Sequence, residues 1–178
     1  MEELEDPTER LRETMEAAEE QKERWTLSVA LSTAIIAVLA AIAGLYGNHH
    51  ANEAMLEQIK SSDQWAYYQS KSIKAEITAA TSQILTALDK PLPAESEEKK
   101  KRYDEDKAEI KKTAEEAHES SERHMRQHIV LSRAVTIFQI AIAISAIAIL
   151  TRKKLMWYVS VLLALVACAF LVLGFLTH

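Results

Sequence analysis

The sequence predicts an all-α membrane protein with three transmembrane helices and a long antiparallel helical hairpin between the first and the second. Two observations predict this fold. Residues 25–47, 134–150 and 155–176 carry no charged side chain, whereas residues 1–24 and 48–133 carry nearly all of the charge. Each uncharged run also has the length of a bilayer crossing, because roughly 20 residues at about 1.5 Å each span about 30 Å. A water-soluble protein would interleave the two kinds of residue around one core.

The acidic N-terminal segment, residues 1–24, is predicted to form a helix that continues into the membrane. Asp6 is placed to cap this helix, Pro7 suits its first position, and Glu9 follows three residues after the cap. No other proline or glycine occurs before Gly44. We therefore expect one unbroken helix from about residue 8 into the first apolar run.

The first transmembrane helix is predicted at residues 25–47. Trp25 and Tyr46 lie at its two ends, where aromatic side chains often mark the membrane interface. Small residues recur inside it at alternating steps of four and three, and in lipid such residues let helix backbones approach closely. We expect this face to pack tightly, within one chain or between copies, through Ala30, Ala34, Ala37, Ala41 and Gly44.

Residues 48–128 are predicted to form an extramembrane helical hairpin with its turn near 89–93, where Pro91 and Pro93 cannot continue a helix. Residues at roughly heptad spacing are expected to face the opposite arm. Because this seam is small and partly polar, neighbouring copies or the membrane base should support it. The expected seam positions are Met55, Ile59, Ser62, Ala66, Gln69, Ile73, Ala80 and Ile84 in the first arm, and Tyr103, Ile110, Ala114, Ala117, Ser121, His124, His128 and Leu131 in the second.

The second and third transmembrane helices are predicted at residues 129–150 and 155–178, joined by a tight basic turn. Lys and Arg near the membrane favour the cytoplasmic side. An inside N-terminus gathers more of these residues there than the opposite orientation, and it puts the hairpin on the far side of the membrane. The flanks compared are Lys22, Arg24, Arg152, Lys153 and Lys154 against Lys60, Arg123 and Arg126.

Charge and motif content argue against several classes of function. The net charge is −5, and the one basic run, residues 99–102, is enclosed by acids, so nucleic acid is not an expected partner. The single cysteine, Cys168, allows no intrachain disulfide. The sequence contains no nucleophile elbow, phosphate-binding loop, zinc-protease motif or dinucleotide fingerprint, so we expect no enzyme.

The segment from Asp63 to Lys74, DQWAYYQSKSIK, closely resembles the signature of a bacterial membrane-protein family known as domain of unknown function 4337. In that family a Trp-Ala-aromatic-aromatic-Gln-x-Lys-x-Ile-basic segment follows an N-terminal transmembrane helix, and two C-terminal transmembrane helices come later. The resemblance covers most of the chain in layout and about a dozen residues in detail. It implies a protein of the bacterial inner membrane, with a periplasmic hairpin in the orientation above, and it implies no activity.

The order of the motif residues does not by itself say what they do. On a helix, Trp65, Tyr68 and Gln69 share one face, and Tyr67 and Lys71 share the next. We expect these side chains to pack at an interface, mostly between subunits, since large aromatics are typical of such surfaces. The alternative is a recognition face for a peptide, a lipid headgroup or a soluble ligand.

Histidines are expected to cluster at the base of the hairpin. With both membrane ends level, position 50 lies opposite about 126, which brings His49 or His50 close to His124 and His128, with Glu53 one turn away. Two histidines four residues apart suit a divalent metal ion, and imidazole also titrates near neutral pH. Simple hydrogen bonding to water, headgroups or a carboxylate is the competing interpretation. No other cofactor is expected.

The predicted function is therefore that of a non-enzymatic, homo-oligomeric, membrane-anchored scaffold or interaction protein. Its expected partners are the lipid bilayer and further copies of itself. The alternative is an oligomeric channel or transport component for ions or small solutes, with metal or pH sensing at the histidines. Its candidate pore-lining residues are Ser28, Ser32, Thr33, Gln139 and Ser145.

Overall fold

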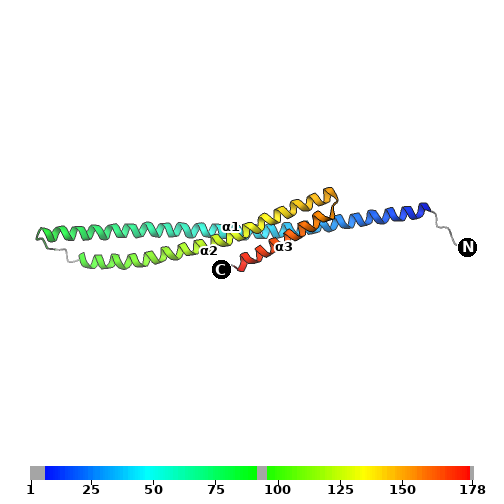
Figure 1. Ribbon diagram of the computed structural model, residues 1–178. Helices are drawn as coiled ribbons and strands as arrows, with labels where there is room; N and C mark the ends of the chain where they lie inside the picture. The colour runs from blue at the N-terminus through cyan, green and yellow to red at the C-terminus, as the bar shows by residue number, and fades with distance from the viewer. Residues whose placement is uncertain (1–6, 92–95, 177–178) are drawn as a thin grey trace. The chain divides into compact units, whose positions relative to one another are not determined.

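The computed structural model describes residues 7–91 and 96–176, and these residues form three α-helices with no strand among them (Figure 1). The helices are α1 (Pro7–Ala87), α2 (Ser96–Thr151) and α3 (Lys154–Leu176). Each contains a stretch long and apolar enough to cross a membrane. The prediction of an all-helical chain with three such segments is confirmed.

Helix α1 runs for 81 residues because nothing in its sequence breaks it. Pro7 occupies the first position, where a missing N–H costs no hydrogen bond. The helix ends where Asp89 adopts a left-handed φ of 50° and the Lys90 amide donates to the Leu85 carbonyl over 2.9 Å. Pro91 follows and excludes a further turn. The predicted cap at Asp6 lies outside the described residues.

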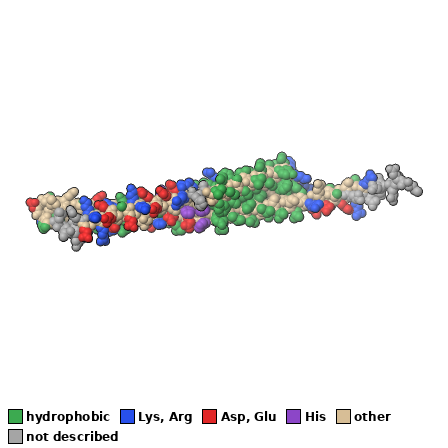
Figure 2. Space-filling view, turned by 90° about the horizontal axis from the view of Figure 1, so that it is seen from below, with side chains coloured by type: hydrophobic (Ala, Val, Ile, Leu, Met, Phe, Trp, Pro, Cys, Tyr) green, Lys and Arg blue, Asp and Glu red, His purple; other side chains and the backbone are tan. Residues whose placement is uncertain are grey.

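The chain divides into two compact units. Among the described residues, one comprises 7–47 and 129–176 and is called here the three-helix unit; the other comprises 48–91 and 96–128 and is called the two-helix unit. Hydrophobic side chains gather over the apolar segments of the first, and charged side chains over the second (Figure 2).

The three-helix unit is built on small side chains. Phe138 is its largest fully buried residue, and most of its other core positions are alanine, together with Ile36, Leu131 and Leu171. The Ser160 hydroxyl donates to the Ala141 carbonyl over 2.7 Å, which ties α3 to α2. Small residues allow such close approach of helices in an apolar setting, where bulk alone gives no preference.

The face that α1 buries in this unit is not the predicted small-residue face. The buried positions are Val29, Ile36 and Ala43, whereas Ala30, Ala34, Ala37 and Ala41 are exposed and Gly44 is half-buried. The expectation that these four alanines pack within one chain is therefore wrong, because the larger residues one position earlier fill the space beside α2 and α3. Packing between copies stays a prediction.

The two-helix unit contains α1 residues 48–87, called the first arm, and α2 residues 96–128, called the second arm. The Ser61 hydroxyl donates to the Ala114 carbonyl over 3.0 Å, and the Ser121 hydroxyl donates to the Ala54 carbonyl over 2.7 Å. Partner positions rise in one arm as they fall in the other, so the arms are antiparallel. The connection predicted at 89–93 lies partly outside the described residues.

The contact between the arms confirms one predicted seam and corrects the other. In the set predicted for the second arm, Ile110, Ala114, Ala117, Ser121 and Leu131 are buried, and Tyr103, His124 and His128 are half-buried. In the first arm the predicted seam is wrong: its positions are all exposed. The side chains that face α2 lie about one position away and are smaller or polar: His50, Ala54, Glu57, Ser61, Gln64, Tyr68, Lys71 and Ala75.

Candidate functional site

The aromatic motif lies on the first arm, and its side chains divide between the contact with α2 and the surface. Tyr68 is half-buried in the seam, and Trp65 packs edge-to-face on it with ring centroids 5.5 Å apart. Trp65 remains 36% exposed and Tyr67 49% exposed. Gln69 is exposed as well. Of the residues predicted for this interface, Tyr68 and Lys71 therefore lie against α2. Trp65, Tyr67 and Gln69 remain accessible.

Lys71 of the motif forms an ion pair with the second arm. Its Nζ donates to Asp106 Oδ2 over 2.6 Å, and it lies 5.3 Å from the ring centroid of Tyr67 and 5.6 Å from that of Tyr103. The hydrogen bond to Asp106, and then that to Tyr67, raise the pKa of Lys71 above its ordinary value. A cation held between a carboxylate and two aromatic faces fixes the relative position of the arms.

Sequence reasoning missed Asp106 and Tyr103 as partners of this lysine. The antiparallel register that places position 50 opposite about 126 also places Lys71 opposite about 105. The same register could therefore have predicted that Lys71 lies beside Tyr103 and Asp106. Beside it, Lys107 Nζ lies 2.8 Å from Asp104 within the same helix. That hydrogen bond lowers the pKa of Asp104 and raises the pKa of Lys107.

Of the predicted histidine cluster, the structure brings His50 and His124 into direct contact. Their Nδ1 atoms are 3.1 Å apart and their rings stack with centroids 5.3 Å apart, while the His49 ring lies 5.6 Å from that of His50. One Nδ1 must donate a proton and the other accept it, so the contact holds at most one shared proton. Burial lowers the pKa of His50, and the neighbouring His124 and His49 lower it further, against the opposing effect of Glu53.

The same residues do not form a metal centre. Among residues 7–91 and 96–176, no group of three or more His, Cys, Asp or Glu side chains lies close enough together to hold a metal ion. His128 lowers the pKa of His50 electrostatically, as the smallest of the causes. The geometry is that of an imidazole pair, which suits proton binding better than metal ligation.

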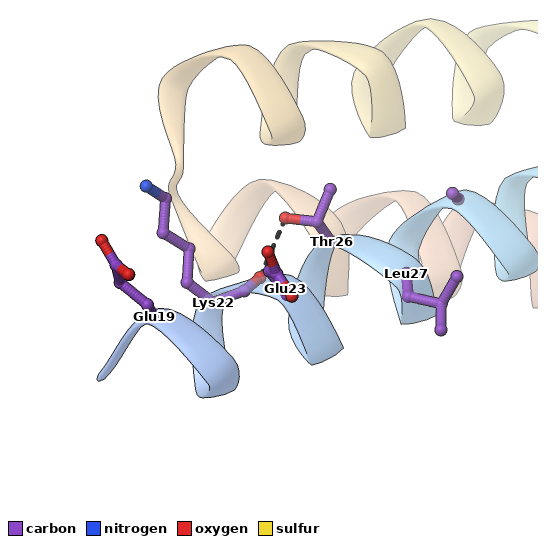
Figure 3. A pocket seen from close by; sticks show the side chains of 6 residues that line it. Glu19, Lys22, Glu23, Thr26 and Leu27 are labelled. Atoms are coloured by element: carbon purple, nitrogen blue, oxygen red, sulfur yellow. Dashed lines mark hydrogen bonds between the residues drawn. The ribbon is translucent and has the colours of Figure 1, made fainter. Parts of the chain in front are cut away.

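One surface hollow lies along α1 and is lined by Glu19, Lys22, Glu23, Thr26, Leu27 and Ala30 (Figure 3). The Thr26 hydroxyl donates to the Lys22 carbonyl of its own helix over 3.0 Å, so this group is already satisfied. A hollow on one helix, without polar groups that converge from several elements, lacks the features of a small-molecule site.

Comparison with known proteins identifies one relationship. The model of a family described as "Domain of unknown function (DUF4337)" matches residues 25–177, most of the chain. No curated protein and no solved structure gives a significant match.

Proposed function

The chain belongs to the DUF4337 family, and we propose that it is a homo-oligomeric, membrane-anchored helical scaffold without catalytic activity. In this proposal three helices cross the membrane, and the two-helix unit forms a hairpin between the first and second crossings. The assembly presents the outer surfaces of these hairpins to other proteins or to further copies.

One observation carries the proposal of self-association. The small-residue face of α1, from Ala30 to Ala41, is exposed in the single chain although it lies in an apolar segment. In lipid, a face of small residues gains from close contact with another helix and gains little from lipid tails. A second observation points the same way. Gln139 is a polar residue exposed in an apolar segment, and a neighbouring copy would give it a hydrogen-bonding partner.

The proposed orientation puts the N-terminus in the cytoplasm and the hairpin in the periplasm of a bacterial inner membrane. The basic turn at Arg152, Lys153 and Lys154, together with Lys22 and Arg24, supports it through the excess of basic residues expected on the cytoplasmic side. Labelling of single cysteines in intact cells tests it. A cysteine at Ala108 should react with an impermeant reagent and one at Lys153 should not; the reverse pattern contradicts this orientation.

Native mass spectrometry of the full chain in detergent tests self-association directly. We expect more than one copy per particle, and we expect the double variant Ala34→Leu, Ala37→Leu to shift the distribution toward single copies. Ala169→Leu, an exposed position on α3, serves as the matched control and should change nothing. A wild-type chain that is strictly monomeric overturns the proposal.

The second candidate is an oligomeric channel for ions or small solutes, and the exposed Gln139 is the observation that favours it. The other candidate lining groups are engaged within one chain: Thr33 and Ser145 hydrogen-bond to each other, Ser32 accepts from Trp157 Nε1 over 3.1 Å, and the Ser28 hydroxyl donates to the Arg24 carbonyl over 2.9 Å. Planar-bilayer recording discriminates the two functions. Conductance that Gln139→Leu abolishes supports the channel, and its absence at every voltage and pH supports the scaffold.

A further inference from the structure

The first arm carries a second, outward apolar face that no part of the described chain covers. Met55, Ile59, Ile73, Ile77 and Ile84 are each more than half exposed. With the exposed Ala66 they follow intervals of four, seven, seven, four and seven residues, which puts all six on one side of the helix. The face is roughly 45 Å long at about 1.5 Å per residue.

The corresponding surface of the second arm is an ordinary hydrated one. Its exposed residues are mostly charged and pair along their own helix, as Lys101 with Glu105, Lys111 with Glu115 and Lys112 with Glu116 do at 3.7–3.9 Å. None of the six residues of the outward face of the first arm is charged, and Ser62, Gln69 and Ala80, which lie between them, are uncharged too. This difference shows that the first arm has a surface suited to burial against another apolar helix.

We propose that this outward face pairs, in parallel, with the same face of a second copy. The inference rests on the proposed function, because it names the extramembrane surface through which the homo-oligomer associates. Two-fold symmetry places a face against itself, so residues at its centre meet their own counterparts. A charge-free face tolerates that arrangement, whereas the charged outer face of the second arm would meet like charges. Copies anchored in one membrane with one orientation can pair along their length only in parallel.

The available area is adequate for a membrane-anchored pair. The five large side chains are each 52–63% exposed, and pairing removes this apolar surface from water along the length of the face. Proteins that meet freely in solution bury roughly 1,200–2,000 Å² in stable interfaces. Anchoring in the same membrane raises the effective concentration of the copies, so a smaller interface suffices.

Disulfide trapping on the full chain tests both the face and the direction. Three variants each carry one introduced cysteine, at Ile59→Cys, Ile73→Cys or Ile84→Cys, and each also carries Cys168→Ser to remove the native thiol. Membranes that contain each variant are oxidised before denaturing electrophoresis. We expect a dimer band for all three, since in-register parallel helices bring equivalent positions within disulfide reach. Ala108→Cys, exposed on the second arm, is the matched control and should stay monomeric. Crosslinking at Ile73 alone indicates antiparallel pairing and overturns the inference, as does crosslinking at none of the three.

Charge substitution provides a second test that does not depend on oxidation. Ile59→Glu with Ile73→Glu puts four carboxylates into the proposed interface, and we expect at least a tenfold weaker association by native mass spectrometry. Ala108→Glu should leave the distribution unchanged. Both wild-type positions are exposed in the single chain, so the helices still form, and circular dichroism verifies this. If the oligomer persists undiminished, this inference fails while the proposed function stands; a monomeric wild type ends both.

Discussion

The two arms of the two-helix unit contact each other, yet they place their large apolar side chains on different sides. The second arm turns Ile110 and its alanines inward and covers its outer face with ion pairs. The first arm turns alanine, serine and polar residues inward, and leaves Met55, Ile59, Ile73 and Ile84 exposed. The difference fits the pairing proposed above, in which the second arm has one partner helix and the first arm has two.

Reciprocal serines explain how an inward face with so little apolar bulk still holds the arms together. Ser61 donates to Ala114 of the second arm, and Ser121 donates to Ala54 of the first, so each arm contributes one donor and one acceptor. Both hydroxyls are buried, and so are both alanines. Small side chains bring the backbones close enough for these bonds, and the bonds satisfy the polar groups that burial would otherwise leave unpaired.

The largest effect should come from Ile110, the biggest buried apolar side chain of this contact. Ile110→Ala is expected to cost about 2 kcal/mol, the lower end for such truncations, because the contact is only two helices thick. Amide hydrogen exchange on the full chain should then show protection within residues 48–128 reduced about 30-fold. Met125→Ala, a truncation at an exposed position of the same arm, should change protection by less than about threefold. Equal effects would show that the inward face of the second arm is not special.

Much of the structure of the two arms could be predicted from the sequence. The prediction failed at the seam of the first arm, for one physical reason. The helices, the seam of the second arm and the meeting of His50 with His124 follow from apolar runs, heptad spacing and antiparallel register. The seam of the first arm did not follow, because pattern reasoning assigns the largest apolar residues, such as Ile59 and Ile73, to the nearest partner. Sequence shows that a helix has an apolar face but not which of two partners that face meets.

The next effect in size concerns the reciprocal serines. Ser61→Ala and Ser121→Ala should each lower the stability of the contact by about 1 kcal/mol, since each removes one buried hydrogen bond while the accepting carbonyl keeps its helical partner. The double variant should be additive, because the two bonds join different residues seven positions apart in each arm. Ser62→Ala, at an exposed neighbouring position, is the control. Hydrogen exchange that responds to only one serine would contradict the reciprocity.

A smaller effect is expected at Lys71, because its ion pair with Asp106 is only partly shielded from water. Lys71→Met keeps the apolar stem and removes the charge, and Asp106→Asn removes the opposite charge. Each should lower protection around residues 68–74 and 103–109 less than the serine variants do. If the pair acts as a unit, the double variant should match either single one. Lys111→Met, which breaks an ion pair within one helix, should leave the other arm unaffected.

The smallest and most conditional effect is a pH dependence at the imidazole pair. The lowered pKa of His50 means that the folded chain binds a proton less readily than the unfolded chain, whose histidines titrate near 6.5. The contribution of this contact is therefore complete above that pH and is lost as the pH falls through the lowered pKa of His50. A second proton would also turn both Nδ1 atoms into donors that face each other across 3.1 Å.

Hydrogen exchange compared at pH 7.5 and 5.5, after correction for the intrinsic rate, should show a local loss of protection around residues 48–54 and 121–128. His124→Gln should reduce that loss, because it removes a neighbouring imidazole that lowers the pKa of His50 and supplies an amide oxygen that accepts from neutral and protonated His50 alike, while the effect of burial remains. His118→Gln, on the outer face of the second arm beside Glu122, should preserve it. A pH response that His124→Gln leaves undiminished would assign it to other groups and leave the imidazole pair a purely structural contact.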